Sequence, residues 1–196
     1  MKKIKEKFST LDYHKKYSLY NLILLFFIFS MVGWLWEVIL HIFSDGMFVN
    51  RGVLLGPWLP IYGSGGILII LITKRWLNRP FVTFGVIVVT CAVIEYATSW
   101  YLETFKGAKW WDYSDLPLNL HGRICLEGLL IFGIGGCIFL YLAAPKLDAL
   151  LNRIPKTIKT VVCLLLIAIF VVDFIHSIDH PNMGQGITAA QLIAKL

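Results

Sequence analysis

Charged residues are scarce in this chain. Asp, Glu, Lys and Arg make up 15% of its 196 residues, against 58% hydrophobic residues, and the mean hydropathy is +0.73. Soluble globular domains carry about 25% charged residues, so this composition excludes the chain from that class. The sequence therefore predicts an integral membrane protein.

Motifs of nucleotide hydrolysis and of common hydrolases are also missing. The sequence has no glycine-rich phosphate loop, no HExxH and no GxSxG. No basic stretch is interleaved with aromatic residues, so nucleic acid is not expected as a partner. The four cysteines form no close pair and no zinc-type spacing, and we expect them to be small packing residues. These patterns leave the cofactor, if the protein has one, unknown.

Five apolar stretches approach the about 20 residues that a helix needs to cross a bilayer. They lack the alternation of barrel strands, and helices satisfy every backbone amide internally. The predicted fold class is all-α, a polytopic membrane helix bundle of about five transmembrane helices. The expected spans are 19–43, 52–73, 81–104, 122–144 and 158–179. The expected organisation is a basic cytoplasmic tail (1–18), one transmembrane domain (19–180) and an extracytoplasmic tail (181–196).

Positive residues fix the predicted orientation, because they favour the cytoplasmic side. The N-terminal tail, the 74–80 loop and the 145–159 loop hold 13 of the 18 lysines and arginines. Five spans with the N-terminus inside place these three segments together in the cytoplasm. We therefore expect a multi-pass protein of the cell membrane.

Ionisable side chains in the predicted spans all fall in the outer half of the bilayer. Such residues are costly unless they face protein or water, which makes them functional candidates. We expect the carboxylates of Glu37, Glu95 and Glu127 to converge in a wet hollow. Arg123 and Glu127 are four residues apart and are expected to pair on one helix face. The alternative is that each charge reaches the interface or joins helices without binding anything.

Two further segments are expected at the same extracytoplasmic side of the membrane. NRGVLLGPWLPIYGSGG (50–66) is rich in glycine and proline, which interrupt a helix and leave about 16 residues, 58–73, for regular structure. Interrupted helices line binding sites in transporters, although close packing is an alternative role for these glycines. KGAKWWDYSDLPLNLHGR (106–123) suits an interfacial aromatic belt or a lid over a polar ligand. Both segments are predicted to border one pocket.

Three residues near the C-terminus are candidate metal ligands. Asp173, His176 and His180 have the spacing of ligands on one helix face. Histidines near an interface are more often solvated, so we expect no metal ligand set, and these three residues are the candidates if a metal binds.

Several ordered motifs resemble a known family. GWLWEVIL (33–40), NRGVLLGPWLPIYGSGG (50–66), EYATSWYLE (95–103) and WDYSDLPLNLHGRICLEG (111–128) are similar to the putative ABC-transporter type IV, or CmpB-like, membrane proteins and to the transmembrane protein 229 group. The resemblance covers about 33–128 and leaves Asp173 and His176 outside it. It implies a transport component, with a separate ATPase or a second copy of the chain as partner beside membrane lipids.

The leading hypothesis is a small transport component that binds a polar or cationic solute or a lipid headgroup in an outward-facing pocket. The alternative is a membrane-embedded enzyme that acts on a lipid-linked or extracytoplasmic substrate by carboxylate acid–base chemistry. A non-catalytic sensor or assembly factor is the third reading, so whether the protein is an enzyme stays open. The expected ligand-binding residues are Glu37, Arg51, Tyr62, Glu95, Trp111, Asp112, Tyr113, Asn119, Arg123 and Glu127.

Overall fold

The computed structural model describes residues 14–183. Residues 1–13 of the expected basic tail and residues 184–196 of the expected C-terminal tail lie outside this range. Helices make up most of the described chain, and the two strands are only two residues long each, as an all-α prediction requires. Its elements are α2 (Leu19–Asp45), α3 (Pro60–Thr73), α4 (Pro80–Lys106), β1 (Asn119–Leu120), β2 (Ile124–Cys125), α5 (Leu126–Ile138), the π-helical segment η1 (Phe139–Ala143), α6 (Ala144–Leu151) and α7 (Lys156–Asp179).

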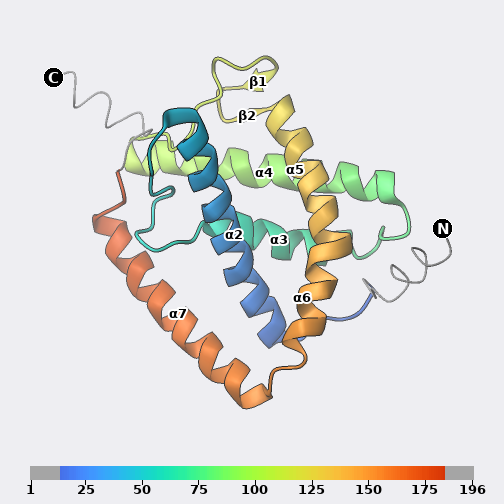
Figure 1. The fold of residues 1–196 in the computed structure, drawn as a ribbon. Helices are drawn as coiled ribbons and strands as arrows, with labels where there is room; N and C mark the ends of the chain where they lie inside the picture. The colour runs from blue at the N-terminus through green and yellow to red at the C-terminus, as the bar shows by residue number, and fades with distance from the viewer. Residues whose placement is uncertain (1–13, 184–196) are drawn as a thin grey trace.

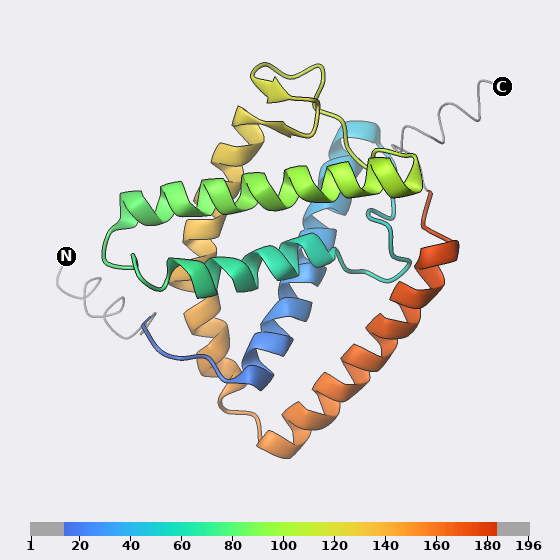
Figure 2. The same ribbon diagram turned by 180° about the vertical axis from the view of Figure 1, so that it is seen from behind.

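The helices form a bundle with steep crossings. In Figure 1, α2 and the continuous α5–α6 rod run close to vertical, α3 and α4 cross them, and α7 forms one flank. Figure 2 shows α3 and α4 side by side on the opposite face. The ends of α3 and α6 and the starts of α2, α4 and α7 lie toward one side of the molecule, with the β1–β2 hairpin and the C-terminal end of α7 opposite. This arrangement gathers the described parts of the three basic segments on one side.

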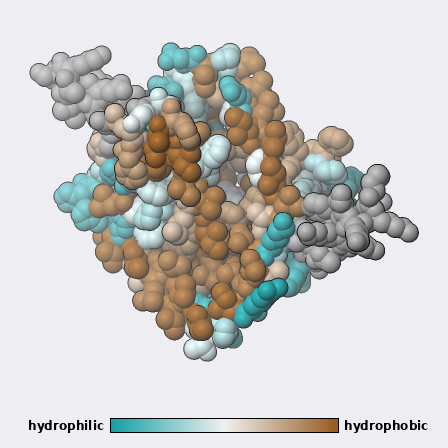
Figure 3. Space-filling view, in the orientation of Figure 1, coloured by the Kyte–Doolittle hydropathy of each residue, from teal (hydrophilic) through white to brown (hydrophobic). Residues whose placement is uncertain are grey.

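Four helical stretches are long and apolar enough to cross a membrane: Leu19–Ser44, Pro80–Lys106, Leu126–Leu151 and Lys156–Asp179. Their surface is correspondingly apolar, and Figure 3 shows brown side chains over most of the visible face, with teal groups gathered near its edges. The protein is therefore a multi-pass membrane protein of all-α class.

The second predicted span is shorter than the others. The helix begins only at Pro60, and its 14 residues measure about 21 Å, less than the about 30 Å of a hydrocarbon core. The preceding glycine- and proline-rich residues form a loop. Proline at the first helical position fits because its missing N–H would have no intrahelical partner there. The interruption expected from the sequence thus lies before the helix.

Glycines allow the helices to approach closely. A Cβ on Gly63 of α3 would lie 2.5 Å from the Phe26 carbonyl oxygen of α2, and one on Gly33 of α2 would overlap the Tyr62 ring. On α5, Gly133 would meet Phe84 at 2.7 Å, and Gly136 would meet the Ile87 side chain at 2.5 Å. These glycines therefore serve packing within the chain, and Gly33 seats Tyr62 of the site described below.

The fourth span extends beyond its predicted end. The sequence predicts a loop from 145 to 159, but α6 continues to Leu151 and only a short turn precedes α7. The prediction was wrong because the uncharged run ends at residue 144, before Lys146, whereas the helix continues past both Pro145 and Lys146. Proline removes one backbone donor and crowds the preceding turn, and the wider π-helical turn at Phe139–Ala143 accommodates it: the Ala144 N–H bonds to the carbonyl of Phe139.

A buried polar network joins α2, α6 and α7 at the side where the basic segments gather. Asp148, 3% exposed, accepts hydrogen bonds from Asn21 Nδ2 at 2.6 Å and Asn152 Nδ2 at 2.8 Å. The Lys159 ammonium donates to Asn21 Oδ1 at 3.0 Å, and Lys15 Nζ lies 3.5 Å from Asp148. The network fixes the start of α2 against two later helices.

Candidate functional site

The first carboxylate of the site, that of Glu37, connects α2 to α3 and to the loop between them. The Tyr62 hydroxyl donates to Glu37 Oε1 at 2.5 Å, and Arg51 Nε lies 3.7 Å from Glu37 Oε2. The Arg51 guanidinium also donates to the Trp110 carbonyl at 3.0 Å. Glu37 therefore has both a neutral donor and a cation beside it, and Arg51 connects it to the 107–118 segment.

The second carboxylate belongs to α4 and is more deeply buried. Glu95 is 6% exposed, and its Oε1 accepts a hydrogen bond from the Tyr113 hydroxyl at 3.0 Å. Burial, followed by the nearby Glu95 carboxylate, raises the pKa of the Tyr113 phenol well above its ordinary value, so this hydroxyl stays protonated and donates. Electrostatic interactions link Glu95 to Glu37 and Tyr113 to Tyr62. The structure thus brings these two carboxylates into one polar cluster.

Several buried atoms of this cluster lack a hydrogen-bond partner among the described residues. They include Glu95 Oε2 and the hydroxyl of Ser99, which lies one turn further along α4 and is 2% exposed. Arg51 Nε is a third such atom, with only its ion pair to Glu37 nearby. Unpaired buried polar atoms are costly and uncommon. The unsatisfied acceptor and hydroxyl on one face of α4 make the Glu95 region the strongest candidate for binding.

Arg123 does not pair with Glu127. Its guanidinium instead binds Glu103 near the end of α4, and its Cζ lies 5.4 Å from the centre of the Tyr96 ring. The expected pairing was wrong because α5 begins only at Leu126, so Arg123 lies in a turn and not on the same helix as Glu127. Glu127 itself is exposed. Of the three carboxylates that were predicted to converge, those of Glu37 and Glu95 lie in one cluster, and that of Glu127 does not join them.

A small hairpin organises the segment that follows α4. Asn119 pairs with Cys125 and Leu120 with Ile124, with a turn between them in which His121 and Gly122 have φ values of 55° and 67°. Glycine suits this left-handed conformation. The Asn119 amide bonds to the carbonyls of Ser114 and Leu116, and its Oδ1 accepts from the Gly122 N–H at 3.0 Å. Asn119 therefore shapes the loop around Tyr113.

Two other predicted site residues also support this loop. The Trp111 indole donates to the Arg123 carbonyl at 3.0 Å. Asp112 is exposed and accepts hydrogen bonds from the Ser114 N–H and hydroxyl. Burial works to raise the pKa of Asp112, but these hydrogen bonds and the Lys109 ammonium outweigh it and hold the pKa below its ordinary value. These hydrogen bonds of Trp111 and Asp112 stay within the 106–123 segment, and Trp111 also packs against the cluster of Leu102, Ala108 and Trp110.

Asp173 faces the glycine- and proline-rich loop and not the two histidines. Its carboxylate accepts from the N–H groups of Leu55 and Gly56 at 3.0 and 2.9 Å, and from the Trp58 indole at 2.7 Å. His176 and His180 are exposed and lie against each other, with ring centres 5.1 Å apart. Within residues 14–183, no group of three His, Cys, Asp or Glu residues could hold a metal ion. Asp173 instead fastens α7 to the loop.

Most of the chain matches one known protein family. A family model described as "Putative ABC-transporter type IV" matches residues 24–178, which is most of the chain. The chain belongs to this family. The ABC-transporter type IV match extends beyond the 33–128 resemblance and includes Asp173 and His176, so excluding them from the family region was wrong. No curated protein and no solved structure matches the chain.

The family and the apolar helices together identify a membrane protein related to transport. Within the matched region, sequence reasoning missed Glu103 as the partner of Arg123, although it lies in the quoted EYATSWYLE motif. It also missed the contact of Asn50 with Trp34, in which the Trp34 indole donates a hydrogen bond to Asn50 Oδ1 at 2.7 Å. Asn182, beyond the match, bonds to the carbonyls of Asn50 and Gly52. No helical periodicity signals these contacts, because one partner in each lies in a loop.

Proposed function

We propose that the protein is the membrane component of a transport system and binds a small cationic or polar solute at the polar cluster around Glu95. The observation that carries this proposal is the buried Glu95 carboxylate with one unpaired oxygen beside the unpaired Ser99 hydroxyl. An ionised carboxylate in a poorly solvated place must take up a proton, bind a cation or meet another polar group.

The charge of the cluster favours a cation over an anion. Arg51 is beside Glu37, and Arg123 is beside Glu103, so both guanidiniums already have acidic partners. The Tyr113 hydroxyl that contacts Glu95 is neutral. One buried carboxylate therefore remains without a cation among the described residues, which gives the cluster an excess of negative charge for a ligand to balance.

Glu95→Gln tests the proposal because it removes the charge and keeps the size of the side chain. We expect a cation among choline, ethanolamine, spermidine, Na⁺ and K⁺ to raise the thermal unfolding midpoint of the purified protein by about 5–10 °C at about 100 times its Kd. The same cation should leave the Glu95→Gln midpoint unchanged. Fluorescence-detected unfolding in detergent micelles provides the measurement.

Glu127→Gln is the matched control, because Glu127 is an exposed carboxylate on the neighbouring helix. It should respond to the cation as the unmodified protein does. The cation is then placed inside proteoliposomes: a transport role requires its release unchanged, whereas chemical conversion would favour the membrane-embedded enzyme. Equal responses of Glu95→Gln and the unmodified protein would refute a site at Glu95.

A partner ATPase follows from the family and from the missing nucleotide-binding motif. We propose that this subunit binds a separate ATPase on the side of the basic segments. Gentle purification from native membranes with mild detergent should retain a protein with a nucleotide-binding loop, identified by mass spectrometry. If this chain were recovered alone under conditions that preserve a known ABC complex, the proposal of an ATPase partner would be contradicted. An ion gradient would then remain as the energy source for transport.

A further inference from the structure

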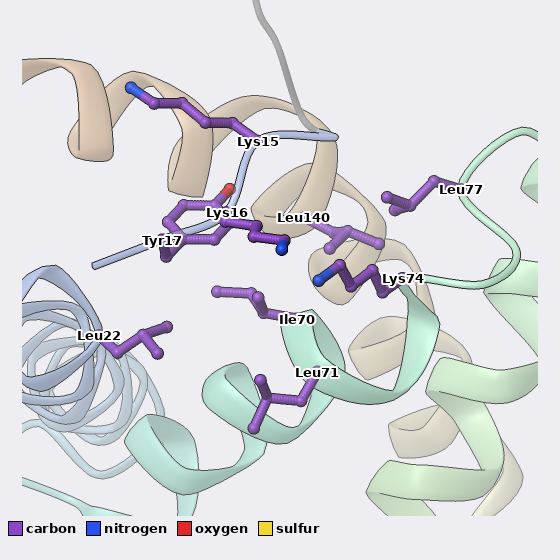
Figure 4. A pocket seen from close by; sticks show the side chains of 9 residues that line it. All are labelled: Lys15, Lys16, Tyr17, Leu22, Ile70, Leu71, Lys74, Leu77 and Leu140. Carbon is purple, nitrogen blue, oxygen red and sulfur yellow. The ribbon is translucent and has the colours of Figure 1, made fainter. Parts of the chain in front are cut away.

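A second polar feature lies on the opposite side of the molecule from the Glu95 cluster. A cavity of about 190 Å³ opens between the segment before α2, the end of α3 and the π-helical segment. Its lining combines basic and apolar side chains in one place, as Figure 4 shows.

The cavity has positive charge that the described residues do not neutralise. Figure 4 shows the ammonium groups of Lys16 and Lys74 directed toward each other above Ile70, although they come from segments far apart in the sequence. Lys15 points away and is paired with Asp148. Two like charges facing one space repel each other unless an anion lies between them. The geometry of Lys16 and Lys74 therefore suits a phosphate group.

The rest of the lining suits a hydrocarbon chain. Leu22, Ile70 and Leu140 form an apolar wall, and Leu71 is about half exposed on the outside of α3. This wall continues into the apolar helix surface of a multi-pass membrane protein. A ligand with an anionic head and an apolar tail would satisfy both parts of the cavity, whereas a free phosphate would leave the apolar wall uncovered.

The chain's own N-terminal residues are a poor occupant for this place. Residues 1–13 contain Lys2, Lys3, Lys5 and Lys7 against Glu6 and Asp12, so the segment is itself basic. Its charge has the same sign as that of Lys16 and Lys74. Charge complementarity selects an anionic ligand from the membrane.

We infer that this cavity binds an anionic phospholipid, with its phosphate between Lys16 and Lys74 and an acyl chain along Leu22 and Leu71. This site is separate from the proposed solute site at Glu95 and does not depend on it. A bound lipid would join the segment before α2 to the end of α3.

Native mass spectrometry of the purified protein, titrated with phosphatidylglycerol or with phosphatidylcholine of the same chains, tests the inference. We expect phosphatidylglycerol to bind more tightly. The K16Q/K74Q double variant should weaken its binding about thirtyfold, since each lysine near an anionic lipid contributes about one kcal/mol. The control K146Q/R153Q removes two exposed positive charges outside the cavity and should keep the affinity.

Three outcomes would overturn the inference. The first is equal binding of the two lipids, and the second is an equal loss in both double variants, which would indicate only general surface charge. The third is binding of water-soluble glycerol phosphate as tight as that of phosphatidylglycerol, which would identify a soluble phosphate compound as the ligand. Because Lys16 and Lys74 are exposed, their substitution should preserve the unfolding temperature, which verifies that each variant is folded.

Discussion

Asp148→Ala should lower the free energy of unfolding by about 3–5 kcal/mol, the cost of removing one partner from a buried charged network. The substitution deprives Asn21 and Asn152 of their shared acceptor and Lys15 of its counter-charge. Lys159, also buried, depends on the same Asn21 amide for its hydrogen bond. The measurement is unfolding in mixed micelles at rising denaturing-detergent fraction, followed by tryptophan fluorescence.

Two comparison variants separate this effect from a general loss of charge. Asp148→Asn keeps an acceptor oxygen for Asn21 and should lose clearly less than the alanine variant. Asp115→Ala removes an exposed aspartate on the hairpin side and should change stability by no more than about 0.5 kcal/mol. If Asp148→Ala unfolded at the same detergent fraction as Asp115→Ala, the network would not stabilise the bundle.

Asp173→Ala should release the loop before α3 and cost about 2–3 kcal/mol. Three donors, the Leu55 and Gly56 amides and the Trp58 indole, lose a charged acceptor. Hydrogen bonds to charged groups contribute about 1.5–3 kcal/mol each when buried, and the partial exposure of Asp173 reduces their sum. Hydrogen exchange measured by mass spectrometry should increase across residues 51–59.

Asp179→Ala is the control on the same helix, because that carboxylate is exposed. It should leave exchange in the loop unchanged. Trp58 also packs against Phe27 and Phe170, with ring centres 6.1 and 5.9 Å apart, and these contacts should keep α7 attached in Asp173→Ala. Unchanged exchange at Leu55 and Gly56 would show that the carboxylate does not hold the loop.

Helix composition made much of the fold predictable. Continuous apolar runs predicted the long helices, and the expected shortening of the second run agrees with a helix that begins at Pro60. The end of the fourth span was not predicted, because the uncharged run stops before Lys146, whereas the rod continues through Pro145, which follows a π-helical turn. A residue-by-residue pattern does not reveal such a turn, because it depends on how the rod packs against its neighbours.

The site was less predictable because its contacts are not local. Glu37 and Glu95 were expected to come together from their shared depth, and the structure places them in one cluster. Arg123 was given a helical partner from its spacing, whereas the hairpin directs it to Glu103, twenty residues earlier. Depth can be counted from a sequence, but the direction of a side chain in an irregular segment depends on turn geometry, here the left-handed residues His121 and Gly122.

The π-helical turn sets the rotational phase of the rod that contains α5 and α6. Gly136 and Asp148 are twelve positions apart, which in an uninterrupted α-helix turns them about 120° from each other. The one extra residue taken up by the wide turn reduces this angle to about 20°. A single rod can therefore present a glycine to Ile87 of α4 and, three turns later, a carboxylate to Asn21 of α2 along nearly the same edge.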